Sequence, residues 1–244
     1  MKGRAIATSI VAAAVLAANA AAGPGAMDQS HPARLTARPG PGGTSCKPGT
    51  YTLRLGQWQT AVMKVTSGGA GARPLLLALH GAGGSPDDGL WAFRAALSSP
   101  GMVLVAPQAQ SRVWNPLYGP DLNTIDRALQ RAFARCRVDP RRIAVGGFSD
   151  GAGNALTLGL VNGDLFRAVM ALAPGALIAE KPVGKPRVFV AHGRSDTTIP
   201  IRASDAIVRE LRAARYPVTY RKFPGGHEVP DPISKAAVSW FLRG

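Results

Sequence analysis

Between Ile143 and Leu160 the chain reads IAVGGFSDGAGNALTLGL, and this stretch decides the fold. Its first part is a short apolar run typical of a buried strand, and its last part carries the small and apolar residues of a packed helix. The pentapeptide Gly-Phe-Ser-Asp-Gly at 147–151 joins the two and matches the pattern G-x-S-x-G. A serine on so sharp a strand-to-helix turn is exposed at the top of a sheet, and flanking glycines let neighbouring backbone pass close to it. We therefore predict that Ser149 is a nucleophile, although glycine-rich turns also serve packing or phosphate binding.

A serine nucleophile needs an imidazole that accepts its proton and an acid that orients the imidazole. Of the four histidines, His227 fits the order expected for this turn, which is serine, then acid, then histidine. Asp196 is the predicted acid, because it ends a loop that follows an apolar strand-like run at 188–191. Asp231 stands before Pro232 and is predicted to be a helix N-cap. The alternative acids downstream of the serine are Asp164, Glu180, Asp205, Glu210 and Asp231.

Four motifs occur in a fixed order along the chain. They are Leu-His-Gly-Ala-Gly-Gly-Ser at 79–85, the serine pentapeptide, a His-Gly-x-x-Asp loop at 192–196 and a Gly-His pair near the C-terminus. Together they resemble the α/β-hydrolase fold. Within it they resemble secreted serine esterases of the polyhydroxybutyrate-depolymerase and feruloyl-esterase type, and the phospholipase/carboxylesterase branch. The resemblance runs from about residue 51 to the end.

The resemblance implies how negative charge on the attacked carbonyl oxygen is stabilised. Donors for that charge must already be in place when the serine attacks. The backbone N–H groups of Asp150 and Ala82 are expected to form this oxyanion hole. His80, in the same loop as Ala82, is expected to be structural, and so is His192.

Apolar strand-like segments alternate with helical ones, which predicts a mostly parallel central sheet with helices on both faces. Only residues 173–186 separate two of the strands, so we expect no large lid. Predicted strands span 51–55 and 59–65, an antiparallel pair, and 74–79, 102–106, 143–147, 168–172, 187–191 and 218–223. Predicted helices span 91–97, 122–135, 151–161, 201–214 and 231–242.

The N-terminal part of the sequence differs from the rest. Residues 1–22 carry a basic start, an apolar run and an A-x-A ending, which predict a secretory signal peptide rather than a transmembrane helix. Residues 23–45 are rich in Gly and Pro and are predicted to be a flexible leader. Residues 46–244 are predicted to form one α/β-hydrolase catalytic domain. The mature protein is expected to be secreted or periplasmic, without a stable membrane anchor.

The cysteines, the net charge and the histidine spacing bear on which bonds, partners and cofactors the protein can have. Cys46 and Cys136 allow one internal pairing, and export favours a disulfide over two free thiols. The formal net charge of +15 comes from arginines spread over predicted helices without interleaved aromatics, which argues against a nucleic-acid partner. The histidines lack H-E-x-x-H spacing and the chain lacks a P-loop pattern, so no metal or cofactor is expected.

These features predict an exported serine carboxylesterase that forms an acyl-enzyme and acts as a monomer on small-molecule or polymeric esters. Short-chain, hydroxycinnamoyl and polyester substrates all fit. Trp114 and Tyr118 are candidate substrate contacts, or else anchors of their loop, and Trp91 is expected in the core. The first alternative is a secreted acyltransferase with the same nucleophile. The second is a non-catalytic protein that binds an anionic polymer through its positive surface.

Overall fold

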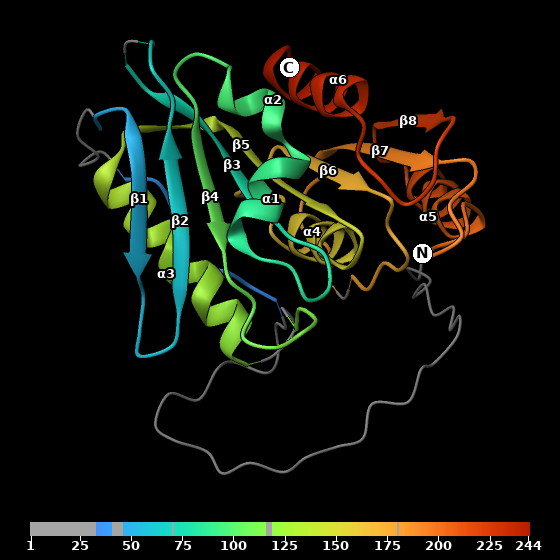
Figure 1. Ribbon diagram of the computed structural model, residues 1–244, viewed down its shortest axis with the longest axis horizontal. Coiled ribbons are helices and arrows are strands. Elements are labelled where there is room, and N and C mark those ends of the chain that lie inside the picture. Colours follow the sequence, from blue (N-terminus) through green and yellow to red (C-terminus); the bar gives the residue numbers. More distant parts are fainter. Residues whose placement is uncertain (1–32, 41–45, 70, 116–118, 180) are drawn as a thin grey trace, which may run out of the picture. The chain divides into compact units, whose positions relative to one another are not determined.

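An eight-stranded sheet lies at the centre of the computed structural model, which describes residues 33–40, 46–69, 71–115, 119–179 and 181–244 (Figure 1). The strands are β1 (Gly49–Arg54), β2 (Thr60–Val65), β3 (Arg73–Leu79), β4 (Val103–Pro107), β5 (Val138–Phe148), β6 (Ala168–Leu172), β7 (Arg187–Gly193) and β8 (Val218–Phe223). Their order in the sheet is β1-β2-β4-β3-β5-β6-β7-β8. The pairs β1–β2 and β2–β4 are antiparallel, and every other neighbouring pair is parallel.

Helices cover both faces of this sheet. They are α1 (Pro86–Ala92), α2 (Arg94–Leu97), α3 (Pro120–Arg135), α4 (Asp150–Val161), α5 (Arg202–Ala213) and α6 (Asp231–Leu242). One apolar cluster packs α3, α4 and α5 against one face, and a second packs α1, α2 and α6 against the other. The prediction of a mostly parallel sheet between two helical layers is therefore confirmed. Within the described ranges, none of the helices has the length and apolar character that a bilayer span needs.

The connection between β6 and β7 is short, and its described residues contain neither helix nor strand. The six strands β3, β4, β5, β6, β7 and β8 all run in one direction, so their carboxyl ends meet at one edge of the sheet. Sites in parallel sheets form at that edge. The loops that follow β3, β5, β7 and β8 carry the predicted site residues, so the topology brings these residues together at one edge of the sheet.

Three local predictions are wrong. The helix predicted at 91–97 is two helices, and the first begins earlier because Ser85 caps it in a capping box with Asp88. Trp91 is 65 % exposed rather than buried in the core, and the guanidinium of Arg94 stacks over its ring. Asp231 does not cap α6. It is the first residue of that helix, and its carboxylate pairs with Arg94.

Residues 33–40 lie against the core, so the prediction of a flexible leader over 23–45 is wrong for this part. Ala33, Leu35 and Ala37 are buried, with exposed fractions of 0, 3 and 2 %. The lower boundary predicted for the catalytic domain, residue 46, is therefore too late. The predicted signal peptide at 1–22 and the other leader residues, 23–32 and 41–45, lie outside the described residues.

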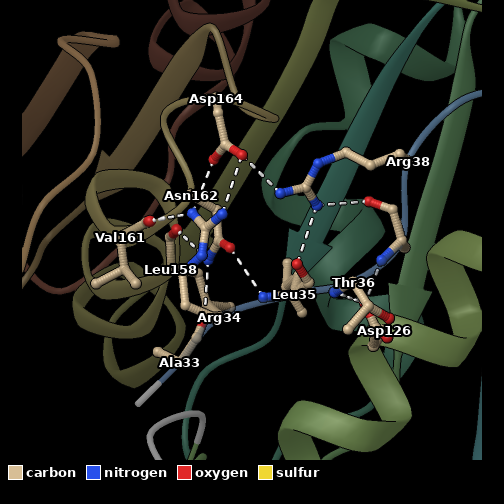
Figure 2. A network of polar contacts seen from close by, with 11 residues as sticks. Ala33, Arg34, Leu35, Thr36, Arg38, Asp126, Leu158, Val161, Asn162 and Asp164 are labelled. Carbon is tan, nitrogen blue, oxygen red and sulfur yellow. Dashed lines mark hydrogen bonds and ion pairs between the residues drawn. The ribbon is translucent and has the colours of Figure 1, made fainter. Parts of the chain in front are cut away.

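Side chains of α3 and of the turn after α4 hold this N-terminal segment in place (Figure 2). The amide of Asn162 accepts the N–H of Leu35 at 2.9 Å and donates to the carbonyl of Ala33 at 2.8 Å. The carboxylate of Asp126 accepts the N–H of Thr36 at 2.8 Å. Buried backbone groups need such partners, and here side chains supply what a neighbouring strand would otherwise give.

A disulfide joins Cys46 to Cys136 across a sequence separation of 90 residues. Cys46 precedes β1, and Cys136 is the residue at which α3 ends before β5. Both cysteines are buried. The bond therefore ties the start of the sheet's edge strand to the segment that leads toward Ser149.

Candidate active site

Ser149 stands between β5 and α4 in a backbone conformation that residues with side chains rarely adopt. Its φ is 58° and its ψ is −121°, and its N–H donates to the carbonyl of Leu172 at 2.9 Å. Glycine is required on both sides. A Cβ at Gly147 would overlap the carbonyl of Gly151, and a Cβ at Gly151 would lie 2.5 Å from the carbonyl oxygen of Leu79. This strained turn holds the serine hydroxyl at the carboxyl edge of the sheet.

His227 lies in the loop after β8 and connects the serine to a carboxylate. Its Nε2 is 2.9 Å from Ser149 Oγ, and its Nδ1 is 2.7 Å from Asp196 Oδ2. Because a carboxylate only accepts, Nδ1 must carry the proton, which leaves Nε2 free to accept one from the serine. The ring lies against Phe148, with 4.7 Å between ring centroids. The imidazole is thus fixed in both tautomer and orientation.

Asp196 is buried and fully engaged as an acceptor. Its Oδ1 accepts the backbone N–H groups of Thr198 at 2.9 Å and Ile199 at 2.8 Å, and its Oδ2 faces His227. Burial acts to raise the pKa of this carboxyl. The hydrogen bonds from His227 and from the Ile199 and Thr198 N–H groups outweigh burial and hold the pKa below its ordinary value. The group is therefore suited to stay ionised beside an imidazole.

The loops that carry the acid and the histidine approach each other at glycine. A Cβ at Gly193 would overlap the carbonyl of Gly226 and lie 2.5 Å from that of Gly225. The N–H of Ser195 donates to the Gly225 carbonyl at 2.9 Å. This close contact between backbones sets the short distance between the Asp196 carboxylate and the His227 ring.

The alternative acids have other positions and other partners. Asp164 pairs with Arg34 and Arg38, Asp205 with Lys222, and Asp231 with Arg94. Glu210 lies on α5, and Glu180 falls outside the described residues. Among the carboxylates that the structure describes, Asp196 is the one that binds His227.

The loop after β3 is held next to the nucleophile by His80, which is 1 % exposed. The Nδ1–H of His80 donates to the carbonyl of Gly81 at 2.7 Å, and its Nε2 accepts the N–H of Ala109 at 3.2 Å. The indole of Trp114 donates to the His80 carbonyl at 2.8 Å. A Cβ at Gly81 would lie 3.4 Å from the Cβ of Ser149. His80 therefore shapes the loop and does not contact the serine hydroxyl.

Two backbone N–H groups near Ser149 donate to no acceptor in the part of the chain that the structure describes. They belong to Ala82, one residue beyond Gly81, and to Asp150, which follows the serine. Unengaged donors beside a nucleophile are what an oxyanion hole requires. These are the two residues that the sequence pattern indicated for that role.

His192 was predicted to be only structural, yet it contacts the acid. Its side chain is buried, and its Nε2 lies 2.8 Å from the carbonyl oxygen of Ile199 and 3.2 Å from Asp196 Oδ2. Its Nδ1 lies 2.6 Å from Ser204 Oγ. No spacing rule connects these residues, so the contact could be found only from the folded structure.

A cleft of about 370 Å³ opens beside Ser149. One wall is the exposed face of α4, and the others come from the loops after β4, β6 and β7. Trp114 lines the cleft, but it is only 5 % exposed and its backbone and indole N–H groups are both hydrogen-bonded, so it also anchors its loop. Tyr118 lies outside the described residues. The cleft is lined by Trp114, Ser149, Asp150, Gly153, Asn154, Thr157, Gly175, Ala176, Ile178 and Ile199.

Known proteins with similar sequences are esterases and thioesterases. Residues 121–242 match the model of the Phospholipase/Carboxylesterase family. The chain is 30 % identical over 115 residues to Acyl-protein thioesterase 1 of Gibberella zeae, a match that covers 43 % of this chain and 48 % of that protein. The chain thus spans about half the length of the curated relative it matches.

Solved structures share the fold at low sequence identity. Est1E from Butyrivibrio proteoclasticus is 16 % identical, with a TM-score of 0.63 over 80 % of this chain and 98 % of that one. Esterase PE8 is 22 % identical, with a TM-score of 0.62 over 74 % of this chain and 96 % of that one. The family match takes in half of the sequence, including β5, the serine turn and the loops of Asp196 and His227. The chain therefore belongs to the phospholipase/carboxylesterase family of α/β hydrolases.

Proposed function

We propose that this protein is an exported serine hydrolase that cleaves carboxylic esters through Ser149, His227 and Asp196. The observation that supports it most is the continuous hydrogen-bonded chain from the serine hydroxyl to a buried carboxylate, with contacts of 2.9 and 2.7 Å. A strained turn presents the hydroxyl, and two unengaged N–H groups lie beside it. The match to the Phospholipase/Carboxylesterase family supports the proposal.

In the first half of the reaction, Ser149 Oγ attacks the ester carbonyl as its proton passes to His227 Nε2. Charge then develops on the former carbonyl oxygen, and the N–H groups of Ala82 and Asp150 receive it. The imidazolium formed on His227 is stabilised by the Asp196 carboxylate. When the tetrahedral intermediate collapses, His227 returns the proton to the leaving alcohol and an acyl-enzyme remains.

In the second half, water takes the place of the alcohol. His227 removes a proton from the water as its oxygen attacks the acyl carbon, and the same two N–H groups bind the new oxyanion. Collapse of this second tetrahedral intermediate breaks the bond to Ser149 Oγ, which recovers its proton from the imidazole. The products are the carboxylic acid and the free enzyme, so the hydrolysis consumes water and no other reactant.

The two alternative functions, an acyltransferase and a non-catalytic binding protein, can be separated from hydrolysis. An acyltransferase would pass the acyl group to an alcohol, so adding an alcohol acceptor and analysing the products separates transfer from hydrolysis. Ester product at the expense of free acid would favour transfer. A non-catalytic binding protein has no need for a strained serine aligned with a buried Asp–His pair, and therefore the geometry favours an enzyme.

Export is part of the proposal. It is supported by the signal-like sequence of residues 1–22 and by the Cys46–Cys136 disulfide, because disulfides persist mainly in oxidising compartments. N-terminal sequencing of protein recovered from outside the cytoplasm tests it. A chain that begins at Met1 there would contradict cleavage of a signal peptide.

A fluorophosphonate probe tests the nucleophile directly. It should label a single peptide that contains Ser149, and Ser149→Ala should lose both labelling and ester hydrolysis, the latter by on the order of 10⁴-fold or more. The matched control is Ser98→Ala. Ser98 is an exposed serine that lies outside the turn at 147–151, so this variant should label like the wild type. Labelling at any other serine would overturn the assignment, provided that the melting temperature of each variant shows an intact fold.

A further inference from the structure

Every hydrogen-bond donor of the polar side chains on the α4 wall of the cleft is already engaged. The amide nitrogen of Asn154 donates to the Asp150 carbonyl at 2.7 Å and to Asp150 Oδ1 at 3.2 Å. Both partners can only accept, so the amide oxygen must point away from them. The hydroxyl of Thr157 donates to the Gly153 carbonyl at 3.1 Å. What these two side chains still offer a substrate is oxygen lone pairs.

The carboxylate of Asp150 adds to this acceptor surface. Its Oδ2 accepts the backbone N–H of Trp114 at 2.9 Å, and its Oδ1 accepts from Asn154. Burial raises the pKa of the Asp150 carboxyl, while the N–H bonds from Trp114 and Asn154 act in the opposite direction and favour the ionised form. Although the chain carries 29 Lys and Arg residues, none lines the cleft in the described part of the molecule.

The side chains that line the rest of the cleft are apolar. Ile199 comes from the loop after β7, and Ile178 comes from the segment after β6, where it is 51 % exposed at the rim. The cleft therefore has one wall of hydrogen-bond acceptors and one wall of aliphatic carbon. Such a cleft favours a ligand that is apolar on one side and carries hydrogen-bond donors on the other.

Because His227 does not line the cleft, we assign the cleft to the acyl group of the ester. The leaving oxygen must reach His227, which is not among the residues that line the cleft. The lining instead includes Ser149 and Asp150, whose N–H is a proposed oxyanion donor. An ester whose carbonyl lies at Ser149 and the Asp150 N–H therefore directs its alcohol toward His227 and its acyl group along α4. From Asp150 to Thr157 the helix extends about 10 Å.

We infer that this cleft selects uncharged acyl groups that carry a hydroxyl donor along α4, with Asp150 and Asn154 as the specificity-determining residues. The inference rests on the proposed function. A carboxylate on the acyl chain would meet the like charge of Asp150 and no donor. An ammonium group would satisfy the acceptors, but the net charge of +15 opposes the approach of a cation.

Four methyl esters with the same six-carbon acyl chain test the inference: hexanoate, 6-hydroxyhexanoate, 6-aminohexanoate and the monoester of adipate. We expect kcat/KM to be about 3- to 10-fold higher for the hydroxy ester than for hexanoate, the gain of one net hydrogen bond. The adipate monoester should be the poorest substrate. In Asn154→Leu the advantage of the hydroxy ester should disappear, whereas Asn123→Leu, on the exposed face of α3, should retain it.

Equal rates for hexanoate and 6-hydroxyhexanoate would overturn the inference, and so would a preference for the adipate or amino ester. Each of these outcomes leaves the proposed ester hydrolysis standing. Failure to hydrolyse any of the four esters, together with absence of fluorophosphonate labelling at Ser149, would instead overturn the proposed function on which the inference depends.

A second inference comes from a different place, the buried side of Asp196. His192 Nε2 faces two acceptors, the Ile199 carbonyl at 2.8 Å and Asp196 Oδ2 at 3.2 Å, so this nitrogen must carry a proton. In the neutral ring, Nδ1 then accepts the hydroxyl proton of Ser204 at 2.6 Å. The side chains of His192 and Asp196 are both completely buried. Two imidazole nitrogens thus lie close to the same carboxylate oxygen, His227 Nδ1 in a hydrogen bond of 2.7 Å and His192 Nε2 at 3.2 Å.

We propose that His192 is a positioning residue for the acid. Asp196 Oδ1 is held by backbone N–H groups of the turn that contains Ile199, and His192 holds both that turn and Oδ2. Without the His192 ring, the turn whose N–H groups hold Oδ1 loses its hydrogen bond at the Ile199 carbonyl, and the carboxylate and the His227 ring lose part of their fixed alignment with Ser149. A misalignment of that kind affects the chemical step more than substrate binding.

The variants His192→Leu and His192→Gln test this role, because the glutamine amide places an N–H near the position of Nε2. His192→Leu should lower kcat by about 10- to 100-fold with KM nearly unchanged. His192→Gln should recover most of the loss. The low-field proton NMR signal of the His227 Nδ1–H should weaken in the leucine variant and return in the glutamine variant.

A purely structural role predicts a different pattern. In that case both variants would lose melting temperature and activity together, with no rescue by glutamine. Wild-type kcat in a folded His192→Leu protein would overturn the proposal, and equal kcat values for the two variants would do the same.

Discussion

The two ends of helix α4 are built in opposite ways. At its N-terminus Ser149 has a φ of 58°, the N–H of Asp150 is unengaged, and the cleft wall offers oxygen lone pairs. At its C-terminus Asn162 is completely buried and both ends of its amide are hydrogen-bonded (Figure 2). One end is left strained and open, and the other is saturated with contacts.

The comparison indicates how a strained site is tolerated in a marginally stable fold. A residue held in an unfavourable backbone conformation costs about 1–3 kcal/mol, and it persists only when the surrounding structure holds it. The N-terminal segment at 33–40, the disulfide and the Asn162 network all stabilise the region around the far end of α4 and α3. We therefore expect substitutions at the two ends to separate activity from stability.

The largest expected effect is on turnover, from Asp196→Asn. The amide can stabilise the wrong tautomer of His227, so kcat should fall on the order of 10⁴-fold with little change in the melting temperature. The matched variant is Asp164→Asn at the other end of α4, which should keep wild-type kcat. Near-normal turnover in Asp196→Asn, measured with a chromogenic ester, would place the acid elsewhere.

Removal of the disulfide should have the largest effect on stability. Replacing both Cys46 and Cys136 with alanine opens a loop of 90 residues, which lowers the free energy of unfolding by about 4–5 kcal/mol on the chain-entropy model. Denaturant titration measures the loss, and kcat of the folded fraction should be unchanged. Thiol labelling of the unfolded, unreduced wild type should give no signal, and a stoichiometric signal would mean that the bond does not form.

A smaller loss of stability is expected from Asn162→Ala. The change leaves the buried N–H of Leu35 and the carbonyl of Ala33 without partners, at a cost of about 1–3 kcal/mol. Asn123→Ala on exposed α3 surface should stay within about 0.5 kcal/mol of the wild type. If the two variants unfold at the same denaturant concentration, the segment at 33–40 does not contribute to global stability.

The smallest effect is expected from Asp164→Asn, and it should disappear in acid. Hydrogen bonds from Arg34, and next from Arg38, hold the pKa of the Asp164 carboxyl well below its ordinary value near 3.8, although burial opposes them. A depressed pKa in the folded state means that the stabilisation is complete above the unfolded value and is lost as the pH falls below it. The stability difference between wild type and Asp164→Asn should therefore be present at about pH 6 and shrink toward about pH 3. A difference that grows on acidification would reverse the assignment.

Much of the candidate site could be predicted from the sequence because its geometry is local. The pattern G-x-S-x-G describes one turn, and both glycines stand where a Cβ would meet backbone. Asp196 and His227 each follow a strand of a parallel sheet, so their meeting at one edge follows from topology alone. His192 differs, since its contact with Asp196 depends on how a buried ring is oriented.

Two other features were missed for physical reasons. The segment at 33–40 has the composition of a leader, yet Ala33, Leu35 and Ala37 alternate with polar residues as in a half-buried strand. The alternation describes this segment better than its composition does. Trp91 is large and apolar, but α1 begins at Pro86, and that start turns the indole toward solvent and Arg94.

The buried segment at 33–40 has a practical consequence for anyone who produces this protein. A shortened version beginning at Cys46 keeps all the strands and helices that the structure describes, together with Ser149, Asp196 and His227, so by its list of elements it looks complete. It would nevertheless uncover the apolar surface that Leu35 covers and leave Asn162 and Asp126 without their backbone partners. Poor yield or aggregation of such a version would reflect this missing cover and would say nothing about the chemistry at Ser149.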